Sequence, residues 1–225
     1  MQCAVAHRVP ALRSIPLRVI AALLSLAPAL PASATALKVS IAARDGRPVA
    51  GAVVTVEPES PGFAPAPPVQ AVMDQVNLAF VPRMLVVPVH SSVQFPNSDA
   101  VSHQVYSFST ARQFQLPLYR GKPYPPVRFD QPGVVTLGCN IHDNMLAYIL
   151  VTAAPHFGMA NDRGEWTVDG LANGRYRVRI WHPLFNETQE VARVVDVAGE
   201  QAIAEFRLAK ALRPAPTDKP RSWNY

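Results

Sequence analysis

Cysteine is scarce in this chain, which holds only Cys3 and Cys139 among 225 residues. Cys3 lies in an N-terminal segment with the features of a secretory leader, so the exported protein would keep one cysteine. A single cysteine excludes a disulfide within the chain. An inert buried thiol, a reactive thiol, a bridge to another chain and a metal ligand remain as interpretations of Cys139.

Charge is also sparse, because 16% of the residues are charged and 49% are hydrophobic. Such a chain can bury a core and does not belong to the disordered class. The formal net charge is +5 and falls to +2 without the leader, which carries three arginines and no acid. This small charge does not indicate a nucleic-acid partner. No stretch after the leader is long and apolar enough to span a bilayer, so we expect no stable membrane insertion after cleavage.

The leader itself occupies residues 1–34. A basic region with three arginines precedes the apolar run from Val19 to Leu30, and Ala32-Ser33-Ala34 supplies small residues at the cleavage position. The run is shorter than the ~18 residues that a membrane-spanning helix needs. The order of these three features is typical of a cleaved signal peptide. We therefore expect a periplasmic or secreted protein.

Proline is frequent, with 23 residues, and no segment has the pattern of a long amphipathic helix. Proline breaks helices but suits turns, loops and strand edges, so the composition favours an all-β fold. Two β-rich regions are expected. One is split between residues 35–57 and 156–209, and the other covers residues 71–155. A proline-rich connector at 58–70 and a flexible tail at 210–225 complete the division.

Several local patterns make specific predictions. Met73–Phe80 is expected to form one strand, and the stretch from Pro117 to Pro132 is expected to be rich in loops. Asn173-Gly174 is typical of a tight hairpin turn. After it, hydrophobic and arginine positions alternate over residues 175–180, which predicts a strand with one wet face.

The main chemical signal is a cluster of three donors in seven residues, Cys139-x2-His142-x2-Met145. A loop leaving a strand end can bring these side chains toward one point. A thiolate, an imidazole and a thioether together suit copper, whereas structural zinc sites favour several cysteines and histidines without methionine. A second imidazole has to come from elsewhere, and His103 is the candidate because it starts a strand after a turn-rich loop. A cysteine-nucleophile enzyme is the weaker interpretation, because nothing beyond His142 suggests a base and an orienting partner.

Residues 72–152 resemble a cupredoxin of the plastocyanin, amicyanin and pseudoazurin type. The matching elements are Phe95-x-Asn97-x-Asp99 before His103, Phe129-x-x-Pro132-Gly133, the Cys139-x2-His142-x2-Met145 loop, and Ala147-Tyr148-Ile149-x-Val151. The whole chain is also similar to bacterial proteins described as methylamine utilisation or plastocyanin-like proteins. The resemblance implies a Greek-key β-sandwich with copper near one end.

The resemblance also implies the role of each residue. Cys139, His103 and His142 would form the trigonal ligand set, with Met145 as the weak axial ligand. Asn97 would bond across the site and hold the loop, although a plain turn asparagine is an equally good interpretation. His90, His156 and His182 are interpreted as non-ligands. The chain departs from many relatives at Ser102, where they have proline, and at Gly138, where they have an aromatic residue.

The flanking regions resemble a second family. Gly46-x-Pro48-Val49-x-Gly51-Ala52-x-Val54 is similar to the opening of a carboxypeptidase-regulatory, transthyretin-like β-sandwich, and residues 162–176 are similar to its continuation. Neither flank alone has enough strands to bury a core. We therefore expect the cupredoxin region to be inserted into the second sandwich; the alternative is an N-terminal hairpin that decorates the cupredoxin and a separate C-terminal domain.

Taken together, the sequence predicts an exported mononuclear (type 1, blue) copper protein, not an enzyme, that carries single electrons between redox partners. Copper binding or delivery without electron transfer is one alternative, and a structural or partner-binding β module is another. The expected partner is a redox protein whose identity the sequence does not specify. Four basic residues around the proline-rich stretch could steer an acidic partner: Arg112, Arg120, Lys122 and Arg128. A scattered, solvated set of surface charges is an equally good interpretation.

Overall fold

The computed structural model describes residues 35–121, 123–186 and 191–215. The described residues form seventeen strands and no helix, and none of them forms a helix that is long and apolar enough to cross a membrane. The prediction of an all-β fold is confirmed. The proposed signal peptide at 1–34, Lys122 and most of the proposed tail lie outside the described residues.

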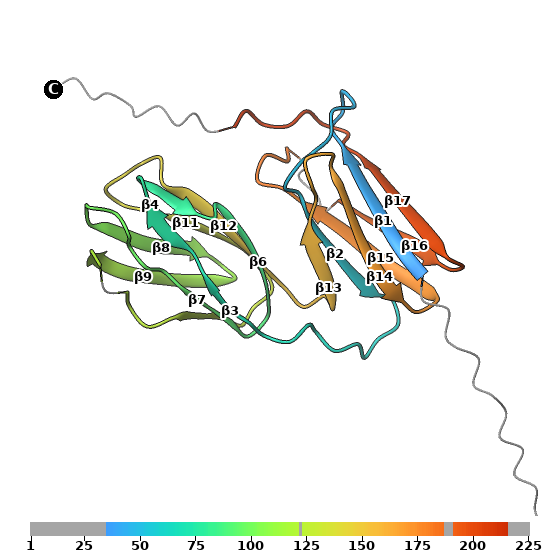
Figure 1. The fold of residues 1–225 in the computed structure, drawn as a ribbon, viewed down its shortest axis with the longest axis horizontal. Coiled ribbons are helices and arrows are strands. Elements are labelled where there is room, and N and C mark those ends of the chain that lie inside the picture. The colour runs from blue at the N-terminus through green and yellow to red at the C-terminus, as the bar shows by residue number, and fades with distance from the viewer. Residues whose placement is uncertain (1–34, 122, 187–190, 216–225) are drawn as a thin grey trace, which may run out of the picture. The chain divides into compact units, whose positions relative to one another are not determined.

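Seven strands from the two ends of the chain form two sheets, and each sheet combines early and late strands. Figure 1 draws the early strands in blue to teal and the late strands in gold to red. One sheet has the order β14-β1-β17 and the other β13-β2-β15-β16. Their bounds are β1 Thr35–Ala42, β2 Val53–Pro58, β13 His156–Met159, β14 Glu165–Leu171, β15 Gly174–Trp181, β16 Val191–Val197 and β17 Gln201–Arg207. The two sheets share one buried apolar cluster, which includes Leu37, Val54, Val178 and Phe206. We call this unit the outer sandwich.

The segments before and after the middle of the chain pair directly in the outer sandwich. β2 pairs antiparallel with β15, with Val56 opposite Val178 and Val54 opposite Ile180. β1 pairs in parallel with β17 and antiparallel with β14. This is the pairing that insertion of residues 71–155 into one sandwich requires.

The middle of the chain forms a second unit with its own core. Its sheets have the orders β10-β7-β3, β6-β12-β11-β8-β9 and β4-β5. The bounds are β3 Gln70–Val72, β4 Asp74–Val76, β5 Ala79–Val81, β6 Met84–Pro88, β7 Ser91–Gln94, β8 His103–Ser109, β9 Arg112–Tyr119, β10 Val127–Phe129, β11 Gly133–Gly138 and β12 Leu146–Thr152. Phe80, Phe95, Phe129 and Ile149 are among the residues of the buried cluster between these strands. We call this unit the inner sandwich.

Two local predictions were wrong. Residues 73–80 form a hairpin rather than one strand, because Asn77 and Leu78 adopt positive φ angles of 52° and 59° and turn the chain. The stretch from 117 to 132, predicted to be rich in loops, also contains the end of β9 at Tyr119 and the short strand β10. A proline is tolerated at position 117 because β9 is an edge strand.

Asn173-Gly174 is the second wrong prediction, because it does not join a hairpin. Leu171 pairs with Thr35 in one sheet, whereas Gly174 pairs with Val197 in the other. The chain therefore crosses from sheet to sheet here, and Leu171 and Tyr176 are both buried in the cluster that the two sheets share. The predicted alternation in the following strand is confirmed, since Tyr176, Val178 and Ile180 are buried and the three arginines are not.

Candidate metal centre

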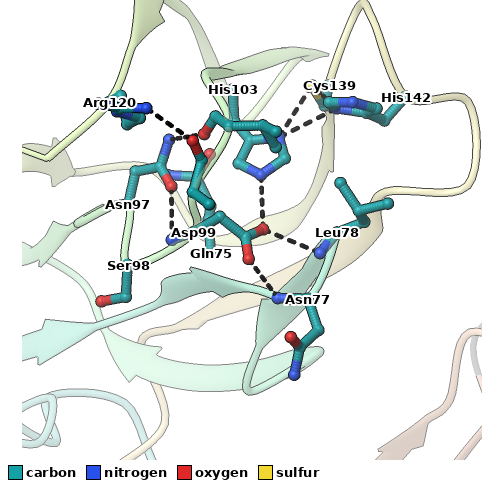
Figure 2. A network of polar contacts seen from close by, with 12 residues as sticks. Gln75, Asn77, Leu78, Asn97, Ser98, Asp99, His103, Arg120, Cys139 and His142 are labelled. Atoms are coloured by element: carbon teal, nitrogen blue, oxygen red, sulfur yellow. Dashed lines mark hydrogen bonds and ion pairs between the residues drawn. The ribbon is translucent and has the colours of Figure 1, made fainter.

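Three of the predicted ligands come from two neighbouring strands and the loop that follows one of them. His103 is the first residue of β8, Cys139 directly follows β11, and His142 lies in the loop before β12. β8 and β11 pair through Tyr106 and Gly138, which brings the start of β8 beside the end of β11. One ligand atom from each of His103, Cys139 and His142 lies within 4.8 Å of the others. Figure 2 shows the three side chains converging.

The three donor atoms are close enough to share one ion. The Nδ1 atoms of His103 and His142 are 3.0 Å apart, and Cys139 Sγ lies 3.6 Å from His142 Nδ1 and 4.0 Å from His103 Nδ1. Two ring nitrogens and a sulfur therefore face a common point. When both rings are neutral and carry their proton on Nε2, their lone pairs and the sulfur offer a trigonal set suited to copper.

Burial differs among the three donors. His103 is fully buried and Cys139 is 4% exposed, whereas His142 is partly exposed. Burial lowers the pKa of His142, the neighbouring His103 ring lowers it further, and Asp99 acts in the opposite direction. A lowered pKa keeps His142 neutral, which is the state that binds a metal. The backbone N–H of Gln104 points to Cys139 Sγ at 3.5 Å and would stabilise a thiolate there.

Met145 belongs to the same loop and is 2% exposed within the core of the inner sandwich. Its backbone N–H donates to the His142 carbonyl at 3.0 Å, which closes the turn between the two residues. This bond closes the loop just before Met145, which is followed directly by β12. The role of the Met145 thioether as a fourth ligand stays a prediction.

Asn97 is buried and acts on the backbone of the loop before His103. Its side-chain amide donates to the carbonyls of Val101 at 3.0 Å and Tyr119 at 2.8 Å, and its oxygen accepts from the Asp99 N–H at 3.0 Å. These bonds link the loop after β7 to the end of β9. They position the loop, while a direct effect on the metal ligands stays a prediction.

A buried pair supports the same loop from below. Gln75 donates from its side-chain amide to the Pro96 carbonyl at 2.9 Å and to the Tyr119 hydroxyl at 2.6 Å, and Tyr119 donates to the Phe95 carbonyl. Burial raises the pKa of Tyr119 to about 12, so its hydroxyl remains a donor at neutral pH. The loop that precedes His103 is therefore held by side chains from β4 and β9.

Asp99 is a residue of the site whose role the sequence analysis missed. Its Oδ2 lies 2.7 Å from His103 Nε2, and its side chain is 12% exposed. Burial acts to raise its pKa, but hydrogen bonds from the Leu78 N–H, the His103 ring and the Asn77 N–H lower it below the usual range. The carboxylate can only accept, so His103 donates from Nε2 and keeps the Nδ1 lone pair free for a metal. The available signal was the position of an acid four residues before a candidate ligand.

The histidines predicted to be non-ligands, His90, His156 and His182, do not belong to this group of donors. Among the described residues, no second group of three histidine, cysteine or acidic side chains has a metal-binding arrangement. His90 pairs instead with Asp130, at 2.8 Å from Nδ1. Burial lowers the pKa of His156 and His182, and the backbone N–H of Leu184 donates to His182 Nδ1.

The three described residues of the basic set, Arg112, Arg120 and Arg128, do not form one patch around the site. Arg112 starts β9 and pairs with Ser109 at the far end of β8, whereas Arg120 follows Tyr119, which pairs with His103. Seven residues of extended strand separate the two ends by roughly 23 Å. Arg128 is ion-paired with Asp130, and Lys122 lies outside the described residues. Arg120 alone of the described three lies at the end of the sheet that carries His103.

No protein-family model and no curated protein matches the chain. Solved structures that resemble part of it include a copper-containing nitrite reductase from Thermus scotoductus, at 25% identity over 43% of this chain and a TM-score of 0.35. This chain covers 25% of that enzyme's length. A purple cupredoxin from Nitrosopumilus maritimus is 21% identical over 36% of this chain and 99% of its own, with a TM-score of 0.33. An amicyanin variant is 17% identical over 44% and 99%, with a TM-score of 0.34. These similarities are partial, so the function below is argued from the residues of this chain.

Proposed function

We propose that this chain is an exported electron carrier that holds one copper ion through His103, Cys139 and His142, with Met145 as the axial ligand. The observation that carries the proposal is the convergence of two imidazole Nδ1 atoms and one thiol sulfur within 4.8 Å. Nitrogen and thiolate donors of this kind bind both oxidation states of copper. When bound, copper supplies a centre that gains and loses one electron.

The protein residues supply rigidity at this centre. His103 is held by Asp99, the loop before it is held by Asn97, and Cys139 leaves a strand that is paired on both sides. A site whose ligands are held in place changes little between oxidation states. Such preorganisation suits electron transfer better than copper delivery, which requires release of the ion.

The surface next to His142 suits brief contact with a partner. Ile141, Leu78 and Val101 are about half exposed, and each belongs to a segment that directly adjoins His142, Asp99 or His103. His142 is the one residue of the proposed ligand set that is partly exposed. Apolar side chains beside it would let a redox protein approach without a strong, long-lived interface. We therefore propose this end of the inner sandwich as the place where electrons enter or leave.

The outer sandwich has a separate role in this proposal. Its strands β2 and β15, which precede and follow the inner sandwich in the chain, pair with each other. We propose that it is a transthyretin-like scaffold from which the copper unit is presented. Neither unit is proposed to be an enzyme, because one-electron exchange requires no substrate pocket.

The visible spectrum of the purified protein after addition of Cu(II) tests the proposal. We expect one copper per chain and an intense charge-transfer band from the thiolate. Cys139→Ser should abolish the band, whereas Met145→Leu should retain copper and raise the reduction potential. A colourless wild-type protein that takes up no copper would contradict the proposal.

Cyclic voltammetry separates electron transfer from copper delivery. A carrier should give a reversible wave and keep its copper through repeated cycles. A protein that loses copper to a weak chelator as soon as it is reduced would instead be a delivery protein.

A further inference from the structure

The tip of the β4–β5 hairpin has an unusual backbone. Val76 pairs with Ala79, so Asn77 and Leu78 form a two-residue turn in which both φ angles are positive. Asparagine tolerates this conformation, but leucine rarely adopts it. The Leu78 side chain is 50% exposed. The conformation therefore calls for another explanation than burial of the leucine.

The turn directs two consecutive backbone N–H groups at one carboxylate. The Asn77 N–H donates to Asp99 Oδ1 at 2.6 Å, and the Leu78 N–H donates to Asp99 Oδ2 at 2.9 Å. Successive N–H groups on one side of a turn form a small anion-binding nest. Figure 2 shows the carboxylate of Asp99 between the turn and His103.

The same carboxylate contacts the ligand. Asp99 Oδ2 also accepts from His103 Nε2 at 2.7 Å. Both oxygens of Asp99 are thus used, one by Asn77 and the other by Leu78 and His103. A carboxylate held at both oxygens cannot rotate away, so the direction of the His103 ring follows from the position of the turn.

A second set of bonds holds the hairpin against the loop that carries Asp99. Ser98 donates from its hydroxyl to Asp74 Oδ2 at 2.6 Å and from its backbone N–H to Asp74 Oδ1 at 3.2 Å. The Ser98 N–H also donates to the Gln75 carbonyl. The turn therefore has a fixed place relative to residues 97–99.

We propose that the Asn77-Leu78 turn is a positioning element of the metal centre: its two N–H groups hold Asp99, and Asp99 fixes the tautomer and orientation of His103. The two residues lie 25 or more positions before the ligand in sequence and contact no donor atom themselves. This inference rests on the proposed copper function, but its hydrogen bonds join protein atoms alone and can therefore be tested in copper-free protein.

The first experiment uses copper-free protein and NMR. Long-range proton–nitrogen spectra should show His103 as the Nε2–H tautomer, and the Asn77 and Leu78 amides should exchange slowly with solvent. In Asp99→Asn, one amide oxygen replaces two carboxylate oxygens and cannot accept from all three donors, so at least one of the two backbone amides should exchange at least tenfold faster. Unchanged exchange of both amides in the variant, or a wild-type His103 that carries its proton on Nδ1, would overturn the inference.

The second experiment measures copper affinity by competition with a chelator. Loss of a partner that orients a metal-ligating histidine typically weakens binding by about 10–100-fold, and we expect a loss of this size for Asp99→Asn. Asp130→Asn is the matched control, because Asp130 bonds His90 rather than a ligand and should leave the affinity unchanged. Equal effects of the two variants would contradict the positioning role.

The turn itself is tested with two further variants. Leu78→Gly removes the side chain but keeps the N–H and tolerates a positive φ, so copper affinity and the Asn77 exchange rate should stay as in the wild type. Asn77→Pro removes one N–H and excludes a positive φ, so affinity should fall as in Asp99→Asn. If Asn77→Pro does not fold, the exchange rates in Asp99→Asn decide the question. A wild-type protein that binds no copper would contradict the proposed function, while tautomer and exchange would still report on the hydrogen bonds.

Discussion

Gly138 offers a sharp test of the packing beside the metal centre. It is the last residue of β11 and directly precedes Cys139. A Cβ atom added there would lie 2.9 Å from both the Cζ and the hydroxyl oxygen of Tyr106, which stands on the neighbouring strand β8. The ring of Tyr106 thus occupies the space in which a side chain at position 138 would lie. We predict that Gly138→Ala destabilises the inner sandwich.

The expected size follows from two opposing effects. Overpacking a well-filled site costs about 1–3 kcal/mol, while replacement of glycine by alanine stabilises by about 0.4–1 kcal/mol through the unfolded state. The Tyr106 ring is only partly buried and its end can swing outward, which favours the lower part of the range. The net loss should be about 1 kcal/mol.

The reasoning is tested with a double-mutant cycle. Tyr106→Leu lacks the two atoms that meet the new methyl group, so Gly138→Ala should be neutral or slightly stabilising in that background. Gly174→Ala is the control, because its Cβ would meet its nearest neighbour, Tyr176, at an ordinary 3.8 Å. A loss at Gly138 that is the same with and without Tyr106 would refute the explanation, and so would an equal loss at Gly174.

The assay has to follow the sandwich that carries each change, so Gly174→Ala is measured by hydrogen exchange of β15 and Gly138→Ala by hydrogen exchange within the inner sandwich. The three tryptophans are Trp166, Trp181 and Trp223, and none lies in residues 71–155, so tryptophan fluorescence does not report directly on the core of the inner sandwich. Hydrogen exchange of the peptide that spans β11 and β12 does. Since 1.4 kcal/mol corresponds to a factor of ten, a loss of about 1 kcal/mol should make the exchange of its most protected amides roughly fivefold faster.

Three further predictions address other parts of the molecule. Intact mass of protein from the cell envelope should show cleavage after Ala34, because cleavage after Ala36 would remove the fully buried Thr35 from β1; a chain beginning at Met1 would contradict export. NMR titration of the copper-free protein should give His142 a pKa below the usual histidine value, because burial and the neighbouring His103 ring lower it, and His103→Gln should raise that pKa by removing the ring. Because the unfolded chain then binds more protons than the folded one, stability should increase as pH rises from the folded pKa of His142 to its unfolded pKa; stability independent of pH in this window would contradict the burial of His142. Gly158→Ala should destabilise the outer sandwich by at least about 1–3 kcal/mol, because its Cβ would overlap the Trp166 ring; a thermal melt followed by tryptophan fluorescence would show it, and an unchanged midpoint would speak against the close packing of β13 on Trp166.

Much of the site was readable from sequence because it is local. Cys139, His142 and Met145 lie within seven residues, so any loop between two strands keeps them near one another. The same holds for the alternation of apolar and arginine positions in β15, which depends only on the period of a strand. The all-β class followed from proline content and from the absence of helical periodicity.

Tertiary structure decided the relationships between segments far apart in the chain. His103 meets Cys139 only because β8 and β11 pair, and His103 is oriented only because a turn 25 residues earlier holds Asp99. The Asn77-Leu78 turn was missed because leucine at positive φ has no local sequence signature. Its unfavourable conformation is stabilised by hydrogen bonds to Asp99, which lies 21 or more residues later in the chain. Likewise, Asn173-Gly174 has the sequence of a hairpin but crosses between sheets, because Leu171 and Tyr176 have to face one core from opposite sides. Local sequence determines which backbone conformations have a low free energy, whereas the burial of a shared core determines which of them the chain adopts.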